Sequence, residues 1–190
     1  MPLERYERPP ASGRLIQGEV IGPVWEYVPA VPPTEVARGA EIPVSPIRHE
    51  RLILVTQDCD LEQDYALRFP RGWDDEPVLV DDEPGAVPHV VLCESFEELR
   101  SRVAGGDIFR RAKRNQDERY HTLPDADVTG TDLRLPTLYI DFRRAVALPT
   151  RFVYAGLREG GIERLALLPE IFRLDLAHRF FGYLSRVPVP

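Results

Sequence analysis

A group of polar side chains with catalytic potential follows an apolar segment early in the chain. Residues 51–57 read Arg-Leu-Ile-Leu-Val-Thr-Gln, and Asp58, Cys59, Asp60 and Glu62 come directly after them. Strand ends are places where rigid scaffolds present polar groups. In an extended chain Asp58 and Asp60 point to one side and Cys59 to the other. Two such carboxylates could act as acid and base or bind a divalent cation.

A structural alternative exists for the same carboxylates, because Asp hydrogen-bonds nearby backbone amides and could cap a turn or the next helix. A ribonuclease built here would use Asp58 or Asp60 as general base. Arg51 or Arg119 would stabilise the phosphate and His121 would serve as general acid. Convergence of these side chains in one open cleft favours the enzyme, whereas capped carboxylates favour a binding protein.

A second polar segment covers residues 115–121, which read Asn-Gln-Asp-Glu-Arg-Tyr-His. Arg119 and His121 could contact phosphate there, with Tyr120 either beside them or in the core. The twenty residues up to Arg119 carry seven cations against three acids, and Arg114 is among them. A preference for arginine codons is the simpler explanation of this composition. Arginine also binds phosphate in a bidentate manner, so RNA is a candidate partner.

The two cysteines, Cys59 and Cys93, both lie at the ends of predicted strands. Pairing of those strands would bring the thiols together, and His89 and His121 could then complete a zinc site. The spacing matches no standard zinc pattern, so no cofactor is predicted, and a divalent metal at the paired carboxylates stays open. Cys59 is also a candidate nucleophile or binding residue. Two cysteines make no secreted disulfide framework, which favours a cytoplasmic protein with reduced thiols.

The overall composition predicts an ordinary globular domain. The chain has 190 residues, of which 43% are hydrophobic and 29% charged. It has no apolar run of the roughly 20 residues that cross a bilayer and no apolar segment after the N-terminus, so neither a membrane span nor a signal peptide is expected. A net charge of −7 argues against general attraction of nucleic acid by the whole molecule.

The pattern of apolar residues and prolines predicts an α+β fold. A flexible arm is expected at 1–12 and a single domain at 13–190, with a helical insertion at about 95–120 and a C-terminal amphipathic helix at about 169–187. The predicted strands are 13–21, 52–57, 89–93, 135–142, 145–148 and 162–168. The predicted helices are 95–104 (opened by a Ser95–Glu98 capping box), 108–118, 152–157 and 170–187, and the long loops are 28–47 and 62–87.

Parts of the chain resemble known proteins. Four segments resemble the conserved blocks of the MazF/PemK toxin family, whose members are small SH3-like barrels that cleave RNA: 13–20, 51–58, 90–95 and 138–149. This resemblance implies a MazF/PemK-like barrel with inserted helices, with Arg51 in the place of the basic catalytic residue. The catalytic threonine of that family has no counterpart near Glu94 and Ser95. This departure from the family pattern argues against RNA cleavage. Segments 57–62, 115–121 and 181–188 resemble uncharacterised bacterial proteins of mobile or defence-related loci.

The resulting prediction is a binding or regulatory component of a bacterial conflict or defence module that contacts a protein partner or RNA. The alternative is a toxin-like ribonuclease or metal-dependent nuclease that uses Asp58 and Asp60. A third hypothesis is a structural subunit, a homodimer included, with a Phe180–Phe181 stripe as its interface. The candidate catalytic residues are Arg51, Asp58, Asp60 and His121, and the candidate binding residues are Cys59, Glu62, Arg114, Arg119 and Tyr120.

Overall fold

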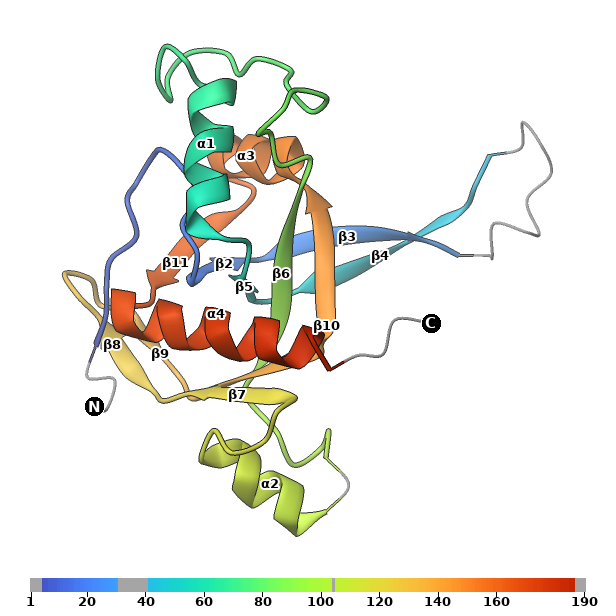
Figure 1. Ribbon diagram of the computed structural model, residues 1–190, viewed down its shortest axis with the longest axis vertical. Helices are drawn as coiled ribbons and strands as arrows, with labels where there is room; N and C mark the ends of the chain where they lie inside the picture. Colours follow the sequence, from blue (N-terminus) through green and yellow to red (C-terminus); the bar gives the residue numbers. More distant parts are fainter. Residues whose placement is uncertain (1–4, 31–40, 104, 187–190) are drawn as a thin grey trace.

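The computed structural model describes residues 5–30, 41–103 and 105–186, and within them the chain forms eleven strands and four helices (Figure 1). The strands are β1 (Arg5–Tyr6), β2 (Glu19–Gly22), β3 (Val24–Pro29), β4 (Val44–His49), β5 (Leu52–Leu54), β6 (His89–Phe96), β7 (Tyr120–Leu123), β8 (Ala126–Val128), β9 (Arg134–Leu135), β10 (Leu138–Pro149) and β11 (Glu163–Leu167). The helices are α1 (Asp58–Arg68), α2 (Gly106–Lys113), α3 (Thr150–Glu159) and α4 (Glu170–Leu184).

The centre of the fold is an antiparallel sheet of six strands in the order β11-β2-β5-β6-β10-β7. This sheet curls into a half-barrel, and a smaller sheet in the order β1-β8-β9 lies across its open side (Figure 1). The α+β class predicted from the sequence is therefore confirmed. The likeness to an SH3-type or MazF/PemK-like barrel stays a prediction.

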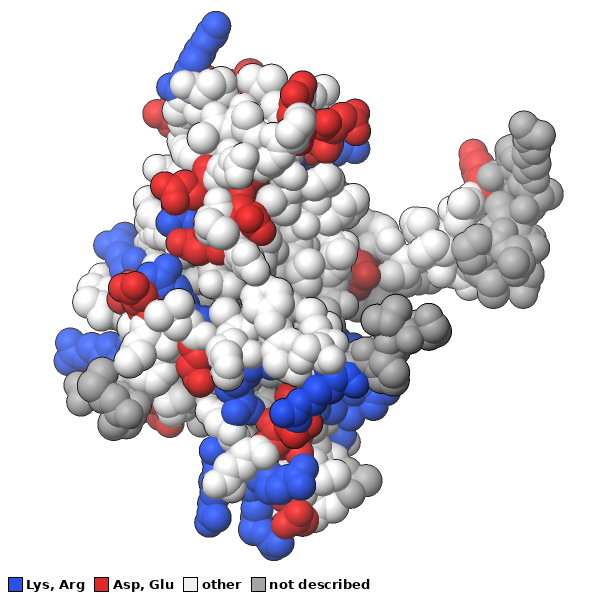
Figure 2. All heavy atoms as spheres, viewed as in Figure 1, with Lys and Arg blue, Asp and Glu red and all other residues white. Residues whose placement is uncertain are grey.

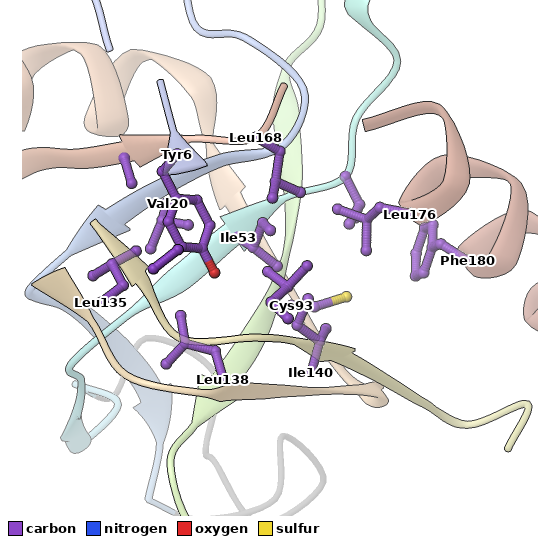
Figure 3. Packing of buried hydrophobic residues seen from close by; sticks show 14 of the residues in the cluster. Tyr6, Val20, Ile53, Cys93, Leu135, Leu138, Ile140, Leu168, Leu176 and Phe180 are labelled. Carbon is purple, nitrogen blue, oxygen red and sulfur yellow. The ribbon is translucent and has the colours of Figure 1, made fainter. Parts of the chain in front are cut away.

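Both faces of the central sheet are buried. Along β5, Leu52 and Leu54 point to one core and Ile53 to the other, and none of the three is exposed. The first core also takes in Leu61 from α1 and Val153 from α3. The second core is closed by α4 and by the small sheet, and Figure 3 shows its residues packed together: Tyr6, Val20, Ile53, Cys93, Leu135, Leu138, Ile140, Leu168, Leu176 and Phe180. The central position predicted for this strand is confirmed.

Two parts extend away from this body. Strands β3 and β4 form a two-stranded hairpin that leaves the sheet to one side, and α2 lies between β6 and β7 at the lower end of the view (Figure 1). The α2 lobe has its own small core of Phe96, Leu99, Ala112, Tyr120 and Tyr139. The longest described helix, α4, has 15 residues, and no helix of the described ranges is long and apolar enough to cross a membrane.

Several predicted elements are confirmed, with shifted ends. Helices α3 and α4 and strand β11 lie where the sequence predicts them, and the helix expected at 108–118 is present as Gly106–Lys113. The strand expected at 89–93 extends to Phe96, and that expected at 52–57 ends at Leu54. Of the first predicted strand, 13–21, only the part from Glu19 onward is extended and paired.

Other predicted elements are wrong. Residues 58–68, expected as an extended end and a loop, form α1, because Leu61 and Tyr65 pack on the sheet at helical spacing. The capping box at Ser95 is also wrong: Ser95 pairs within β6, and its hydroxyl lies 3.2 Å from the carbonyl oxygen of Arg51. The predicted loop at 28–47 contains β4 in its described part. Arg5 and Tyr6 of the expected arm form β1, and Tyr6 is fully buried.

Candidate functional site

The carboxylates of the Asp58–Glu62 segment lie in the first turns of α1 rather than on an extended chain. Asp58 begins the helix and Asp60 follows two residues later. Each helical residue advances the side-chain direction by about 100°, so the two carboxylates point to nearly opposite sides of α1. The predicted shared face of Asp58 and Asp60 is therefore wrong.

Asp58 is held by the loop that precedes β2. Arg14 donates from Nη1 to Oδ1 at 2.8 Å and from Nη2 to Oδ2 at 3.0 Å, and the Gln17 backbone amide donates to Oδ1 at 3.1 Å. The Arg14 guanidinium lowers the pKa of Asp58, and the Gln17 amide adds to this. Gln17 also donates from Nε2 to the carbonyl of Val55 at 3.1 Å. Asp58 thus fixes the loop at 13–18 against the end of β5.

The neighbouring members of the motif stay at the surface. Cys59, Asp60 and Glu62 are exposed, and Cys59 Sγ lies 3.6 Å from Oδ1 of Asp60. Thr56 has a structural role just after the end of β5. Its hydroxyl oxygen accepts a hydrogen bond from the Val91 backbone amide at 2.7 Å. Within the described ranges no three His, Cys, Asp or Glu side chains gather closely enough to hold a metal ion.

The other two candidate catalytic residues lie elsewhere. Arg51 precedes β5, at the opposite end of that strand from Asp58, and donates to Glu97 at 2.6 Å. His121 lies on β7, separated from β5 by β6 and β10, and it is 2% exposed. Burial, assisted by the charge of Arg179, lowers the pKa of His121 to about 3. The four residues therefore do not line one open cleft, and His121 is a neutral core residue at neutral pH.

Arg119 and Tyr120 are likewise used by the fold. Arg119 donates from Nε and Nη2 to the two carboxylate oxygens of Asp141 at 2.7 and 2.5 Å. Its guanidinium lies 4.7 Å from the ring centroid of Tyr120, which is 2% exposed. Arg114 caps the C-terminus of α2 and remains exposed. Of these three binding candidates, Arg114 is the one whose side chain is free to reach a ligand.

Sequence reasoning missed two buried ionic groups. Arg68 donates from Nε to the carboxylate of Asp64 at 2.9 and 3.0 Å and from Nη2 to Asp81 at 2.6 Å. Glu19 is fully buried, with Arg164 Nη1 at 3.3 Å and the Ile16 amide donating at 3.2 Å. Burial raises the pKa of Glu19 to about 7. Asp64 and Arg68 are four residues apart on α1, so a helix predicted there would have indicated their pairing. Asp81 and the Glu19–Arg164 pair join distant segments, which no local pattern could have revealed.

Exposed apolar side chains form the surface that is most suited to binding a partner. Of the 14 large hydrophobic residues that are exposed in the described ranges, five belong to the β3–β4 hairpin or lead into it: Trp25, Tyr27, Ile42, Val44 and Ile47. Trp25 and Tyr27 line a groove of about 390 Å³ together with the end of β10 and with Phe152 of α3. The sequence signal for a strand here was the run of β-branched and aromatic residues at 24–28, Val-Trp-Glu-Tyr-Val.

No family model matches this chain, and neither a curated protein nor a solved structure matches it. The site must therefore be interpreted from its own geometry.

A second apolar area lies on α4, whose outward face carries Ile171, Leu174, Phe181 and Leu184. Figure 2 shows a largely uncharged surface over the middle of α4, whereas Lys and Arg side chains gather around α2 below it. Phe180 itself is 3% exposed and packs on Phe142, so the predicted stripe divides into a buried half and an exposed half. The hairpin differs from α4 because a groove lies beside its exposed aromatic rings.

Proposed function

We propose that this chain is a protein-binding component and that its partner docks on the β3–β4 hairpin and the groove beside it. The observation that carries the proposal is the exposure of Trp25 and Tyr27, at 43% and 60%, on a hairpin that leaves the body of the fold. Exposed apolar patches mark interaction sites, and tryptophan and tyrosine dominate the energetics of protein interfaces.

The hairpin also has a physical reason to be covered. An isolated two-stranded hairpin is at best marginally stable in water, because it buries little apolar surface of its own. A partner that covers Tyr27 and Ile47, on opposite faces of the ribbon, would stabilise both the hairpin and the complex. We further propose that this binding role belongs to a conflict or defence module, which is supported by the resemblance to proteins of defence-related loci.

RNA is the less favoured partner. Four of the arginines between 100 and 119 already contact carboxylates: Arg102, Arg110, Arg111 and Arg119. Arg100 and Lys113 lie over the ring of Phe109 at 5.2 and 5.4 Å from its centroid. Phosphate would have to compete with these contacts. The Tyr27 side chain, in contrast, forms no hydrogen bond with a described residue and is 60% exposed, so a partner can contact it directly.

Site-specific photo-cross-linking in the native host tests the proposal. A photoreactive residue at position 27 is compared with the same residue at 174 on α4 and at 108 on α2, both of which are exposed apolar positions. We expect a discrete protein adduct from position 27. The purified partner should then bind Tyr27→Ser at least tenfold more weakly than wild type, and Leu174→Ser as wild type does.

Three outcomes would overturn the proposal. An adduct only from position 174, with weakened binding by Leu174→Ser, assigns the interface to α4. An RNA adduct only from position 108 assigns it to the α2 lobe. Equal binding of the purified partner by Tyr27→Ser and wild type removes the hairpin from the interface.

A further inference from the structure

One edge of the central sheet is open next to the groove. Strand β10 pairs with β6 up to Pro149, but its pairing with β7 on the other side ends at Asp141. Residues 145–149 therefore have a strand partner on only one side within the described ranges, and Arg143 and Arg144 lie in the irregular stretch of β10 that precedes them. These five residues correspond to an edge of roughly 16 Å, at about 3.3 Å per residue.

Such an edge offers backbone hydrogen bonds to a further strand. Unpaired N–H and C=O groups at a sheet edge are a template for an added strand, and several peptide-binding domains work in this way. Ala145 and Ala147 are exposed on this edge and are small, so a second backbone can approach closely. Trp25, Tyr27 and Phe152 then border the place where side chains of the added strand would lie.

Two cations mark the ends of the open edge. Arg143 is exposed at its start, and its side chain forms no ion pair with a described residue. Arg151 follows its end and lines the groove; it forms a long, exposed ion pair with Asp81 at 3.8 Å. Carboxylates at both ends of an added strand would pair with these arginines.

The same cations argue against a second copy of this chain as the occupant. If two such edges paired antiparallel about Ala147, Ala145 of one copy would face Pro149 of the other, and Arg143 would lie near its Arg151. Like charges that face each other across strands are destabilising. The edge is therefore matched to a different chain.

We infer that the open edge of β10 binds an extended segment of a partner protein, about seven residues long, apolar in its middle and acidic at both ends. The inference deepens the proposed function and rests on it. Backbone hydrogen bonds to residues 145–149 would give affinity, the aromatic groove would select apolar side chains, and the two arginines would select the acidic ends.

A synthetic peptide tests this directly. The probe is a capped seven-residue peptide, Glu-Glu-Val-Thr-Val-Glu-Glu, and its control carries lysine in place of every glutamate. The protein carries Trp73→Phe, which leaves Trp25 as its one tryptophan reporter. We expect a saturable change in Trp25 fluorescence and amide shift changes at 145–148 with the acidic peptide, and at least tenfold weaker binding of the lysine peptide.

A charge reversal sharpens the test. Arg143→Glu combined with Arg151→Glu should invert the preference, so that the lysine peptide binds better. The matched control, Arg110→Glu with Arg114→Glu on α2, has the same net charge and should keep the wild-type preference. N-methylation of alternate peptide amides should abolish binding, because it removes the donors that the edge needs.

Equal binding of the acidic and lysine peptides, or shifts confined to residues outside 145–149 and the groove, would overturn the inference. Its failure is distinguishable from failure of the proposed function. If position 27 still cross-links to a protein and Tyr27→Ser still weakens that complex, the hairpin is the docking element and only the strand addition is wrong.

Discussion

The first turn of α1 and the β3–β4 hairpin make opposite use of their side chains. Asp58 has a reactive carboxylate, but this carboxylate accepts hydrogen bonds from Arg14 and Gln17 within the protein. Tyr27 and Trp25 belong to no catalytic motif, yet they remain exposed beside a groove. A cluster of polar residue types therefore indicates function only when the fold leaves the groups free.

The largest effect is expected from the ionic group that anchors α1. Asp64→Ala should destabilise the protein by about 3–5 kcal/mol, because it removes one of the two carboxylates that bind the buried Arg68 guanidinium and the acceptor of the Val87 amide. Urea unfolding measures this loss. Glu62→Ala, on the exposed side of the same helix, is the control and should change little; a loss below about 1 kcal/mol for Asp64→Ala would contradict the expectation.

A pH-dependent effect is expected from Glu19. Its pKa is raised to about 7 in the folded protein, so the native state binds the proton more tightly than the unfolded state does. The stability contributed by Glu19 is thus highest below its unfolded pKa and is lost as the pH rises through about 7.

Relative to Glu19→Gln, wild type should lose about 3 kcal/mol of unfolding free energy between pH 4.5 and 8. Thermal or urea unfolding across that range is the measurement. Glu163→Gln, at an exposed position, should show no such trend. A wild-type curve parallel to that of Glu19→Gln would mean that Arg164 keeps Glu19 ionised throughout.

A smaller effect separates the two carboxylates of the α1 motif. Asp58→Ala should cost about 1–2 kcal/mol and speed hydrogen exchange of the amides at 13–18, since charge-assisted hydrogen bonds from Arg14 and Gln17 are lost. Asp60→Ala should change stability by less than about 0.5 kcal/mol. Equal effects of the two substitutions would contradict the conclusion that Asp58 is structural and Asp60 is not.

The smallest effect on folding is expected at the hairpin. Tyr27→Ser should alter the unfolding free energy by less than about 0.5 kcal/mol, because 60% of the side chain is already exposed. Chemical denaturation checks this, with Tyr154→Phe as a comparison inside the core. If Tyr27→Ser instead cost more than about 1 kcal/mol, Tyr27 would be part of the fold and a poor reporter of partner binding.

The order of neighbouring residues is enough to predict the elements whose signal is local. The spacing of Phe172, Leu176 and Phe180 predicts α4, and Leu176 and Phe180 are indeed buried there. The apolar run at 52–55 predicts a strand buried on both faces, as found. Such patterns are reliable because burial of one helix stripe or of both strand faces requires apolar residues at fixed short spacings.

The roles of the polar residues, in contrast, follow from the tertiary structure alone. Arg14 reaches Asp58 across 44 positions, and Asp81 reaches Arg68 across 13. Strand order placed His121 in the core and left half of β10 without a second neighbour among the described strands. These outcomes depend on which distant segments meet, because an ion pair, a desolvated imidazole and an open sheet edge are properties of two or more segments together. No local pattern in the chain encodes them.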